Sequence, residues 1–313
     1  MTTHINNVMI LGIIDAYGYQ GRGNLGPYLI AALIKAGFNV SVLSRASSTS
    51  TDETFHGAKI VKSDYTPESL VDVLTGQDAV ISTLSTANIA EQKTVIDAVA
   101  AAKVKRFMPS EFGSDTSIEG LEKMAPFLKG KQDVMDYVKS KEGEGLTWTA
   151  LFTGPWIDWM LIEGKGLLCL NVKSKTGELV DGGKPKFTTT TVSQVGEATA
   201  AALVHSDKTK NQYVHVSSYN ICQEQVIEVL ERISGTKFAL EALSNVDLYA
   251  RGTKNVEEGN WVTGYYELAT STVYSDAEVT YFPDKAEYWK KVLGLDDGES
   301  LDTMITRTLN SAQ

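Results

Sequence analysis

The stretch Ile10–Gly12 (ILG), together with Gly23–Pro27 (GNLGP), carries the strongest signal of fold in this chain. The first stretch ends an apolar segment that predicts a short strand, and the second opens an apolar segment that predicts a helix ending at Gly37. A strand, a glycine-rich turn and a helix are typical of dinucleotide binding, because glycine lets the backbone approach a pyrophosphate and the helix N-terminus offers free N–H groups. The turn residues predicted to bind the dinucleotide are Gly12, Gly23, Asn24, Leu25 and Gly26.

The spacing inside this turn is unusual, because ten residues, Ile13–Arg22, separate Gly12 from Gly23. Two alignments of the motif stay open. In one, Gly12 is the first glycine and Ile13–Arg22 is an insertion. In the other, Gly21 takes that place, and Gly21–Gly26 then has the literal G-x-G-x-x-G spacing. Whether the insertion permits ordinary cofactor binding is left open by the sequence.

Strands and helices are predicted to alternate along the first half of the chain. After the first helix, strands are expected at residues 39–44, 58–62, 78–84, 105–109 and 147–152, with helices at 66–76, 91–102 and 131–141. Such alternation predicts an α/β fold, a Rossmann-like doubly wound parallel sheet with helices on both faces.

The pattern loosens after Pro155. Short strands are expected at 167–172 and 213–216 and helices at 192–204 and 223–234, while the segment 254–264 is polar and contains glycine. We therefore predict an NAD(P)-binding domain at residues 1–153. Residues 154–313 are predicted to form a smaller C-terminal substrate region packed against it, and this division allows for segments that return to the first domain.

Composition restricts the classes of function. The formal net charge of −10 and the lack of a basic stripe argue against a nucleic-acid partner. No apolar run is long enough for a membrane span, and the start of the sequence does not resemble a secretory signal, so a cytoplasmic protein without a membrane partner is expected. Two cysteines and four scattered histidines predict no metal site, and both cysteines are expected to be reduced.

The residues after the second and fourth strands bear on the cofactor. Arg45 follows the second strand, where an acidic residue would read a ribose 2′-hydroxyl and an arginine accommodates a 2′-phosphate, so NADP(H) is favoured over NAD. Thr83, Leu84 and Ser85 follow the fourth strand at the carboxyl edge of the sheet, where ligands bind in open α/β folds. We predict that these three residues contact the cofactor.

Several motifs together resemble one known family. Besides the glycine turn and the strand that ends at Arg45, they are the segment Val104–Gly113, which contains PSEFG, and the later Thr153–Pro155. These residues look like the NmrA-like, isoflavone-reductase-like family of atypical short-chain dehydrogenases, closest to its fungal branch. The resemblance implies NADPH binding, in which Gly154 and Pro155 take part, and reduction of a small aromatic or phenylpropanoid-type substrate.

The resemblance also places a catalytic lysine at Lys131, near the nicotinamide. An ammonium group there could neutralise charge on a substrate oxygen or hold the nicotinamide ribose. A competing site is Tyr137 with Lys141, which has the Tyr-x-x-x-Lys spacing of ordinary short-chain dehydrogenases and which Ser110 could complete. Lys131 and Tyr137 lie about 120° apart around one helix, so both cannot face the same ring. We favour Lys131.

Aromatic residues after the sixth strand suggest a substrate pocket. Trp156, Trp159 and Met160 could wall a pocket for a flat molecule, and Asp158 could bind substrate or point to water. An NADPH-dependent reductase of a conjugated carbonyl-type compound is the leading hypothesis. The alternatives are a redox sensor that binds NADP(H) without turnover and reports to a protein partner, and a relative whose altered turn no longer holds the cofactor tightly.

Overall fold

The computed structural model describes residues 4–12, 25–47, 57–84, 91–162, 166–275 and 279–311. Three of the predicted cofactor-binding residues, Gly23, Asn24 and Ser85, lie outside the described residues. So does the insertion Ile13–Arg22, and the choice between the two alignments of the glycine motif therefore stays open.

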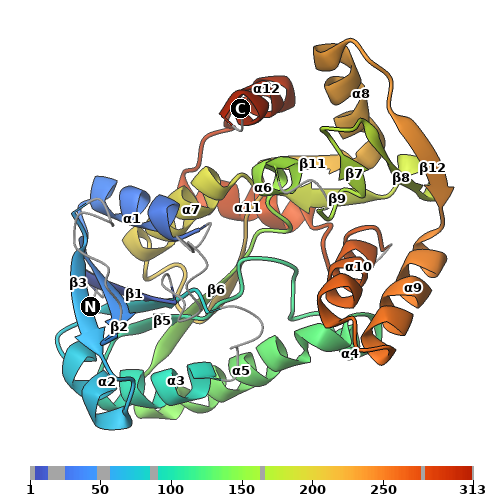
Figure 1. Ribbon diagram of the computed structural model, residues 1–313. Coiled ribbons are helices and arrows are strands. Elements are labelled where there is room, and N and C mark those ends of the chain that lie inside the picture. The colour runs from blue at the N-terminus through green and yellow to red at the C-terminus, as the bar shows by residue number, and fades with distance from the viewer. Residues whose placement is uncertain are drawn as a thin grey trace.

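A seven-stranded parallel sheet forms the centre of the molecule (Figure 1). Its strands, in spatial order, are β3 (Lys59–Ser63), β2 (Asn39–Arg45), β1 (Asn7–Leu11), β4 (Ala79–Ser82), β5 (Arg106–Met108), β6 (Thr147–Phe152) and β10 (Gln212–His215). This order reverses direction between β1 and β4, as in a doubly wound Rossmann sheet. The predicted fold class is confirmed.

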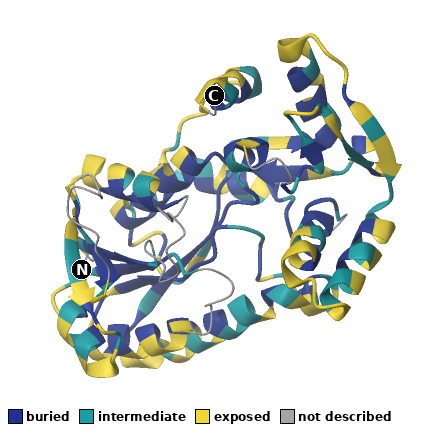
Figure 2. Ribbon diagram, viewed as in Figure 1, coloured by how far each residue is buried: buried dark blue, intermediate teal, exposed yellow. Residues whose placement is uncertain are grey.

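Helices cover both faces of the sheet. One face carries α1 (Gly26–Lys35), α7 (Val192–Val204) and α11 (Pro283–Leu293), and the other carries α2 (Pro67–Leu74), α3 (Gln92–Ala101) and α5 (Lys129–Ser140). In β1, Val8 and Ile10 pack into the first layer, whereas Met9 and Leu11 pack into the second. Because both faces are covered, the central strands β1, β4 and β5 are almost wholly buried and appear dark blue in Figure 2, whereas the edge strand β3 is largely exposed or half-buried.

Local sequence explains why the predicted helix after Thr66 begins where it does. The Thr66 hydroxyl accepts a hydrogen bond from the Ser69 amide, Pro67 occupies the first turn, and Glu68 lies near the positive end of the helix dipole. The helix ends at Leu74, two residues before Gly76.

The C-terminal half builds two small sheets and a set of helices beside the main sheet. One sheet joins β7 (Leu170–Asn171), β8 (Thr176–Val180) and β12 (Ala239–Leu243), and the other pairs β9 (Lys186–Thr189) with β11 (Tyr219–Cys222). The helices are α6 (Ile157–Ile162), α8 (Gln223–Ser234), α9 (Asn245–Glu257), α10 (Trp261–Val273) and α12 (Leu301–Ser311). Of the strand expected at 167–172, only Leu170 and Asn171 pair, and they pair with β8.

The polar segment 254–264 belongs to a helical hairpin made by α9 and α10. One of its two glycines, Gly264, has a packing reason: a Cβ there would lie 2.6 Å from the Val256 side chain and 2.8 Å from the Gly252 carbonyl oxygen. The glycine lets the two helices approach closely, a tertiary requirement that sequence periodicity does not reveal.

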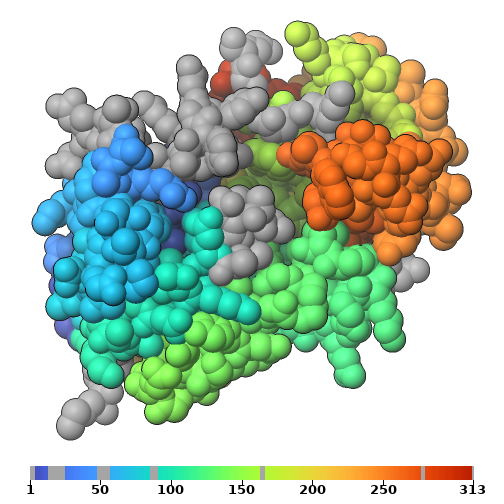
Figure 3. Space-filling model, turned by 60° about the horizontal axis from the view of Figure 1, so that its bottom comes forward, coloured from blue at the N-terminus to red at the C-terminus, as the bar shows by residue number. Residues whose placement is uncertain are grey.

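The two halves of the chain are interleaved. Strand β10 pairs with β6 in the main sheet, and α7 packs against α1. Helices α9 and α10 lie beside the short helix α4 (Leu121–Met124) and the residues after it, as the adjoining orange and green atoms in Figure 3 show. There the Phe127 and Tyr265 rings meet edge to face. The division at residues 153 and 154 stays a prediction.

Within the described ranges, no helix combines the length and the apolar character that crossing a bilayer requires.

Candidate active site

The predicted cofactor turn begins where β1 and β4 end side by side. Gly12 has a φ of +89°, and a Cβ there would lie 2.7 Å from both the Thr83 carbonyl carbon and the Leu84 nitrogen. Thr83 is bound to the same turn, because its amide and its hydroxyl both donate to the Leu11 carbonyl oxygen, at 2.9 and 2.8 Å. Only glycine fits at residue 12, and the fold brings the predicted residues Gly12, Thr83 and Leu84 together.

The N-terminus of α1 supplies the next part of this site. The helix begins at Gly26 with Pro27 in its first turn, and Leu25 before it is buried. Among the described residues no side chain caps this end, and the first turn contains no acidic residue. The positive end of the helix dipole suits an anionic group such as a pyrophosphate.

Arg45 ends β2, next to β1 in the sheet. Its guanidinium lies 5.1 Å from the centre of the Tyr65 ring and 3.7 Å from a Glu91 carboxylate oxygen. These two contacts position a side chain that is still 41% exposed, so N–H groups of its five-donor fork remain accessible to a ligand phosphate.

Lys131 lies in the first turn of α5, and its Nζ donates to the Glu111 carbonyl oxygen at 2.6 Å. Burial lowers the pKa of the Lys131 ammonium, an effect that the Glu111 carboxylate opposes. The Glu111 side chain is itself buried and accepts a hydrogen bond from the Thr116 hydroxyl at 2.9 Å. Burial raises the pKa of the Glu111 carboxyl to about 7, although the charge of Lys131 opposes this change.

The loop that carries Glu111 links Lys131 to the end of β4. The Ser110 hydroxyl donates to the Leu84 carbonyl oxygen at 2.8 Å, and the Ser110 amide donates to the Gln92 side chain at 3.0 Å. Phe112 has a φ of +38° and donates its amide to the Leu151 carbonyl oxygen. One chain of contacts therefore runs from Leu84 through Ser110 and Glu111 to Lys131.

The competing Tyr137 site is not assembled. The Tyr137 hydroxyl donates to Asp97 on α3 at 2.6 Å, and Lys141 binds the same carboxylate at 2.9 Å. The hydrogen bond to Asp97 raises the pKa of Tyr137, which disfavours proton transfer from it. Ser110, which could have completed this set, donates to Leu84 instead.

An apolar pocket of about 220 Å³ opens beside the same loop. Phe112 and Gly113 form one wall, and Gly154 and Pro155 form another, next to Trp156. Gly154 has a φ of +60°, and a Cβ there would lie 2.0 Å from the Thr188 carbonyl oxygen, so the backbone can follow this path only with glycine. The predicted cofactor residues Gly154 and Pro155 thus lie at the pocket wall.

The sequence also suggested that three other residues lie at this pocket, and the structure agrees for one of them. Trp159 lines the pocket, as expected. Met160 does not: it is 1% exposed and packs in the core of the C-terminal half. Asp158 is buried and accepts hydrogen bonds from the Val192 amide, at 3.1 Å, and from the Trp159 amide, at 3.0 Å. Its carboxylate therefore satisfies the free Val192 N–H at the start of α7, so neither of its expected roles is borne out.

The remaining walls come from residues that sequence reasoning missed. Phe127 follows α4, and Ala269 and Val273 lie on α10, more than a hundred residues from the other walls. Phe127 lies four residues before Lys131 in the sequence, but no local pattern marks it as a pocket residue. The α10 residues could be found only from the packing of that helix against the rest of the chain.

The described part of the chain contains no group of three or more His, Cys, Asp or Glu residues arranged to hold a metal ion. Cys169 and Cys222 are free thiols, the first half-buried and the second buried.

Comparison with known proteins gives a consistent picture. The model of the NmrA-like family matches residues 12–294. Oxidoreductase aprR of Aspergillus flavus is 36% identical over 222 residues, covering 70% of this chain and 73% of its own. Oxidoreductase poxI of Penicillium oxalicum is 30% identical over 263 residues, covering 83% of this chain and 82% of its own. The structure of a leucoanthocyanidin reductase–NADPH complex from Vitis vinifera has a TM-score of 0.77 at 19% identity, covering 97% of this chain and 100% of the other.

Proposed function

The chain belongs to the NmrA-like family, and from this premise we propose that it is an NADP(H)-dependent oxidoreductase that reduces a small aromatic or conjugated carbonyl-type molecule. The names of its fungal relatives support the oxidoreductase activity. The NADPH in the similarly folded leucoanthocyanidin reductase complex supports the choice of cofactor.

The residues at the edge of the sheet fit such a cofactor. The cradle at Gly12, which a Cβ would fill, and the free start of α1 would hold the pyrophosphate. Arg45, fixed beside Tyr65, would contact the 2′-phosphate and so favour NADP(H) over NAD(H). When bound, the cofactor supplies a hydride; the chain has to position the substrate and manage the charge and proton at its oxygen.

The observation that carries the proposal is the position of Lys131. Its ammonium is held by the Glu111 carbonyl oxygen, one residue before Phe112 in the wall of the apolar pocket. One N–H of the ammonium makes that contact, so two donors remain for the ribose of the cofactor or for a substrate oxygen. Because burial lowers its pKa, Lys131 is also better able to release a proton to that oxygen than an exposed lysine.

The pocket indicates the kind of substrate. Rings of Phe112, Phe127, Trp156 and Trp159 surround it, and none of the described lining residues carries a charged side chain. Such walls favour a flat, uncharged aromatic body, whose polar oxygen would point toward Lys131.

The first prediction tests this role. Purified protein is mixed with NADPH or NADH while cofactor fluorescence is followed, and aromatic ketones and enones are then screened by loss of NADPH absorbance. We expect Lys131→Ala to lower kcat at least about 100-fold, because acid–base and charge-stabilising groups contribute on that scale. Tyr137→Phe on the same helix is the matched control and should change kcat little, because its hydroxyl binds Asp97.

If Tyr137→Phe lowered kcat strongly and Lys131→Ala changed it little, Lys131 would be rejected as the catalytic residue. NADPH binding without turnover on any compound would favour a redox sensor that reports to a protein partner. Binding of neither nucleotide would overturn both readings and favour a relative that has lost tight cofactor binding.

A further inference from the structure

A second pocket, of about 570 Å³, lies between β7 and β8 on one side and α9 and α10 on the other. It uses a different part of α10 from the aromatic pocket: Glu267 and Thr270 face it, whereas Ala269 and Val273 face the smaller one. Its volume lies within the range of small-molecule sites, roughly 300–1,000 Å³. The reductase function proposed above assigns it no role.

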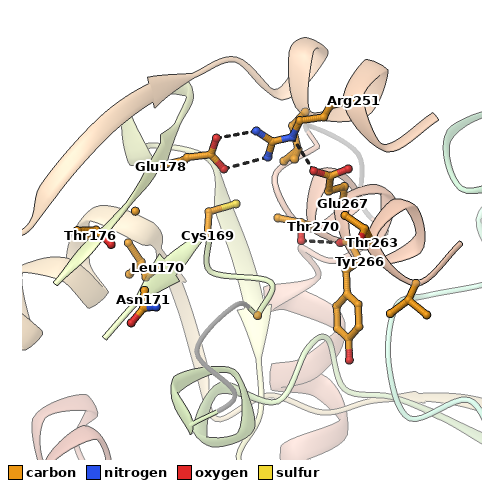
Figure 4. A pocket seen from close by; sticks show the side chains of 14 residues that line it. Cys169, Leu170, Asn171, Thr176, Glu178, Arg251, Thr263, Tyr266, Glu267 and Thr270 are labelled. Atoms are coloured by element: carbon orange, nitrogen blue, oxygen red, sulfur yellow. Dashed lines mark hydrogen bonds and ion pairs between the residues drawn. The ribbon is translucent and has the colours of Figure 1, made fainter. Parts of the chain in front are cut away.

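Three charged side chains meet at this pocket. Arg251 on α9 binds the Glu178 carboxylate of β8 through both terminal nitrogens, at 2.6 and 2.9 Å, and its Nε lies 2.6 Å from Glu267 on α10. Figure 4 shows the guanidinium lying between the two carboxylates. The second Glu267 oxygen accepts a hydrogen bond from Asn255 at 2.7 Å. The group is thus fixed by partners on three elements.

The charges of this group do not cancel. Hydrogen bonding to Arg251 lowers the pKa of Glu178, and hydrogen bonding to Glu178 raises that of Arg251, so both stay charged near neutral pH. With Glu267, the described lining residues carry one positive and two negative charges, a net charge of −1. Cys169 adds none, because burial raises the pKa of its thiol to about 12.

The remaining walls are suited to an apolar molecule. Leu170, Leu248 and Val262 contribute aliphatic surface, and Tyr266 contributes a ring. A carboxylate that already binds Arg251 can still accept a further hydrogen bond, because each oxygen has two lone pairs. An anionic ligand would be repelled by the net negative charge, whereas an ammonium group would be attracted to it and to the face of Tyr266.

We propose that this pocket is a second small-molecule site, and that it binds a compound with an apolar aromatic body and one protonated amine. The site is a binding site only. Its thiol is protonated at neutral pH, and its carboxylates and guanidinium neutralise one another in part. The proposal does not depend on the reductase function, because the described lining of this pocket includes neither Lys131 nor Glu111, whose carbonyl oxygen Lys131 binds.

Three probes with one naphthalene body test the charge preference: the amine 2-(1-naphthyl)ethylamine, the alcohol 2-(1-naphthyl)ethanol and the acetate anion of 1-naphthaleneacetic acid. Binding to the full-length protein is measured by calorimetry near neutral pH. We expect the amine to bind on the order of tenfold more tightly than the alcohol, and the acetate to bind most weakly, as one net charge at short range in a half-open pocket allows.

Two matched pairs of variants separate the pocket from the rest of the surface. Val262→Arg adds a positive charge at an exposed residue that lines the pocket, and Val246→Arg adds one at an exposed residue on α9 that does not. Likewise, Glu267→Gln removes a lining carboxylate, and Glu257→Gln removes an exposed one elsewhere on α9. The preference for the amine should disappear in the first member of each pair and persist in the second.

No binding of the amine, or equal binding of the three probes, would overturn the proposal. A preference for the amine that survives Val262→Arg would overturn it as well. Because Val262 is 72% exposed, that variant is expected to fold and keeps the test decisive even if Glu267→Gln does not fold.

Discussion

At the scale of single residues, Glu111 shows how burial changes the chemistry of a side chain. Its carboxyl is 3% exposed, and burial raises its pKa to about 7. The Thr116 hydroxyl and the charge of Lys131 act in the opposite direction without restoring the ordinary value. The residue is therefore expected to hold a proton over much of the range in which exposed carboxyl groups are charged.

Because Glu111 is protonated in the native state, the free energy of unfolding is predicted to depend on pH. The native state keeps the Glu111 proton up to about pH 7, whereas the unfolded chain releases it near the ordinary pKa of 4.5. The native state thus binds more protons, and the contribution of Glu111 to the free energy of unfolding falls as pH rises through this window. Glu111→Gln removes that loss. The variant should gain up to about 3 kcal/mol relative to the wild type between about pH 5 and about pH 8.

Urea unfolding at several pH values measures this difference. Glu119→Gln is the matched control, because Glu119 is exposed and its variant should follow the wild type at every pH. A difference between Glu111→Gln and the wild type that stays constant with pH would show that the native carboxyl is not held protonated.

At the scale of elements, a buried arginine on β5 joins this strand to its neighbour β6. Arg106 on β5 is 1% exposed and donates to the hydroxyls of Thr147 and Thr149 on β6, at 2.9 and 2.7 Å. It also donates to the Thr209 hydroxyl and to the Ser206 carbonyl oxygen, beyond α7. Burial lowers its pKa to about 10, so it stays charged at neutral pH and ties β5 to β6 and to the turn that leads into β10.

Replacing this residue should destabilise the fold strongly. Arg106→Met keeps the aliphatic stem but leaves buried oxygens without their donor, which predicts a loss of roughly 3 kcal/mol in the free energy of unfolding. Lys105→Met is the control, since Lys105 forms an exposed ion pair with Asp78 and its loss should cost less than about 1 kcal/mol. Equal losses for the two variants in urea unfolding would show that the Arg106 network contributes little.

At the scale of the whole molecule, the main sheet depends on residues from the second half of the chain. Strand β10 adds to its edge beside β6, and α7 covers Leu29, Ile30 and Leu33 of α1 together with the strands beneath them. Without these two elements, β6 would become an exposed edge and one apolar face of the sheet would lie open to water.

A fragment of residues 1–153 is therefore predicted not to fold on its own. Its urea unfolding should lack a cooperative transition, and its near-ultraviolet circular dichroism should be weak, whereas the full chain should show both signals of a packed core. A sharp transition for the fragment would instead show that the division at residues 153 and 154 marks an autonomous domain.

Much of the main sheet was predictable from sequence because its signals are local. Apolar segments of strand length, Thr66 with Pro67 at a helix start, and Gly12 directly after β1 each act over a few residues. The parallel arrangement follows once such strands alternate with helices. The helices 192–204 and 223–234 were predicted with the bounds that the structure has, but α9 and α10 were missed, since their glycines serve contacts between helices.

The candidate site, too, has features that the sequence predicted and features that only the tertiary structure decided. Arg45 and Lys131 were singled out by their positions after a strand and within a family motif, and the helical angle between Lys131 and Tyr137 already separated their directions. The sequence could not tell that Lys131 reaches the Glu111 carbonyl oxygen, that Asp158 accepts the Val192 amide at the start of α7, or that α10 closes the aromatic pocket. Those facts depend on contacts between segments far apart in the chain, which arise only when helices and strands pack and bury their apolar faces together.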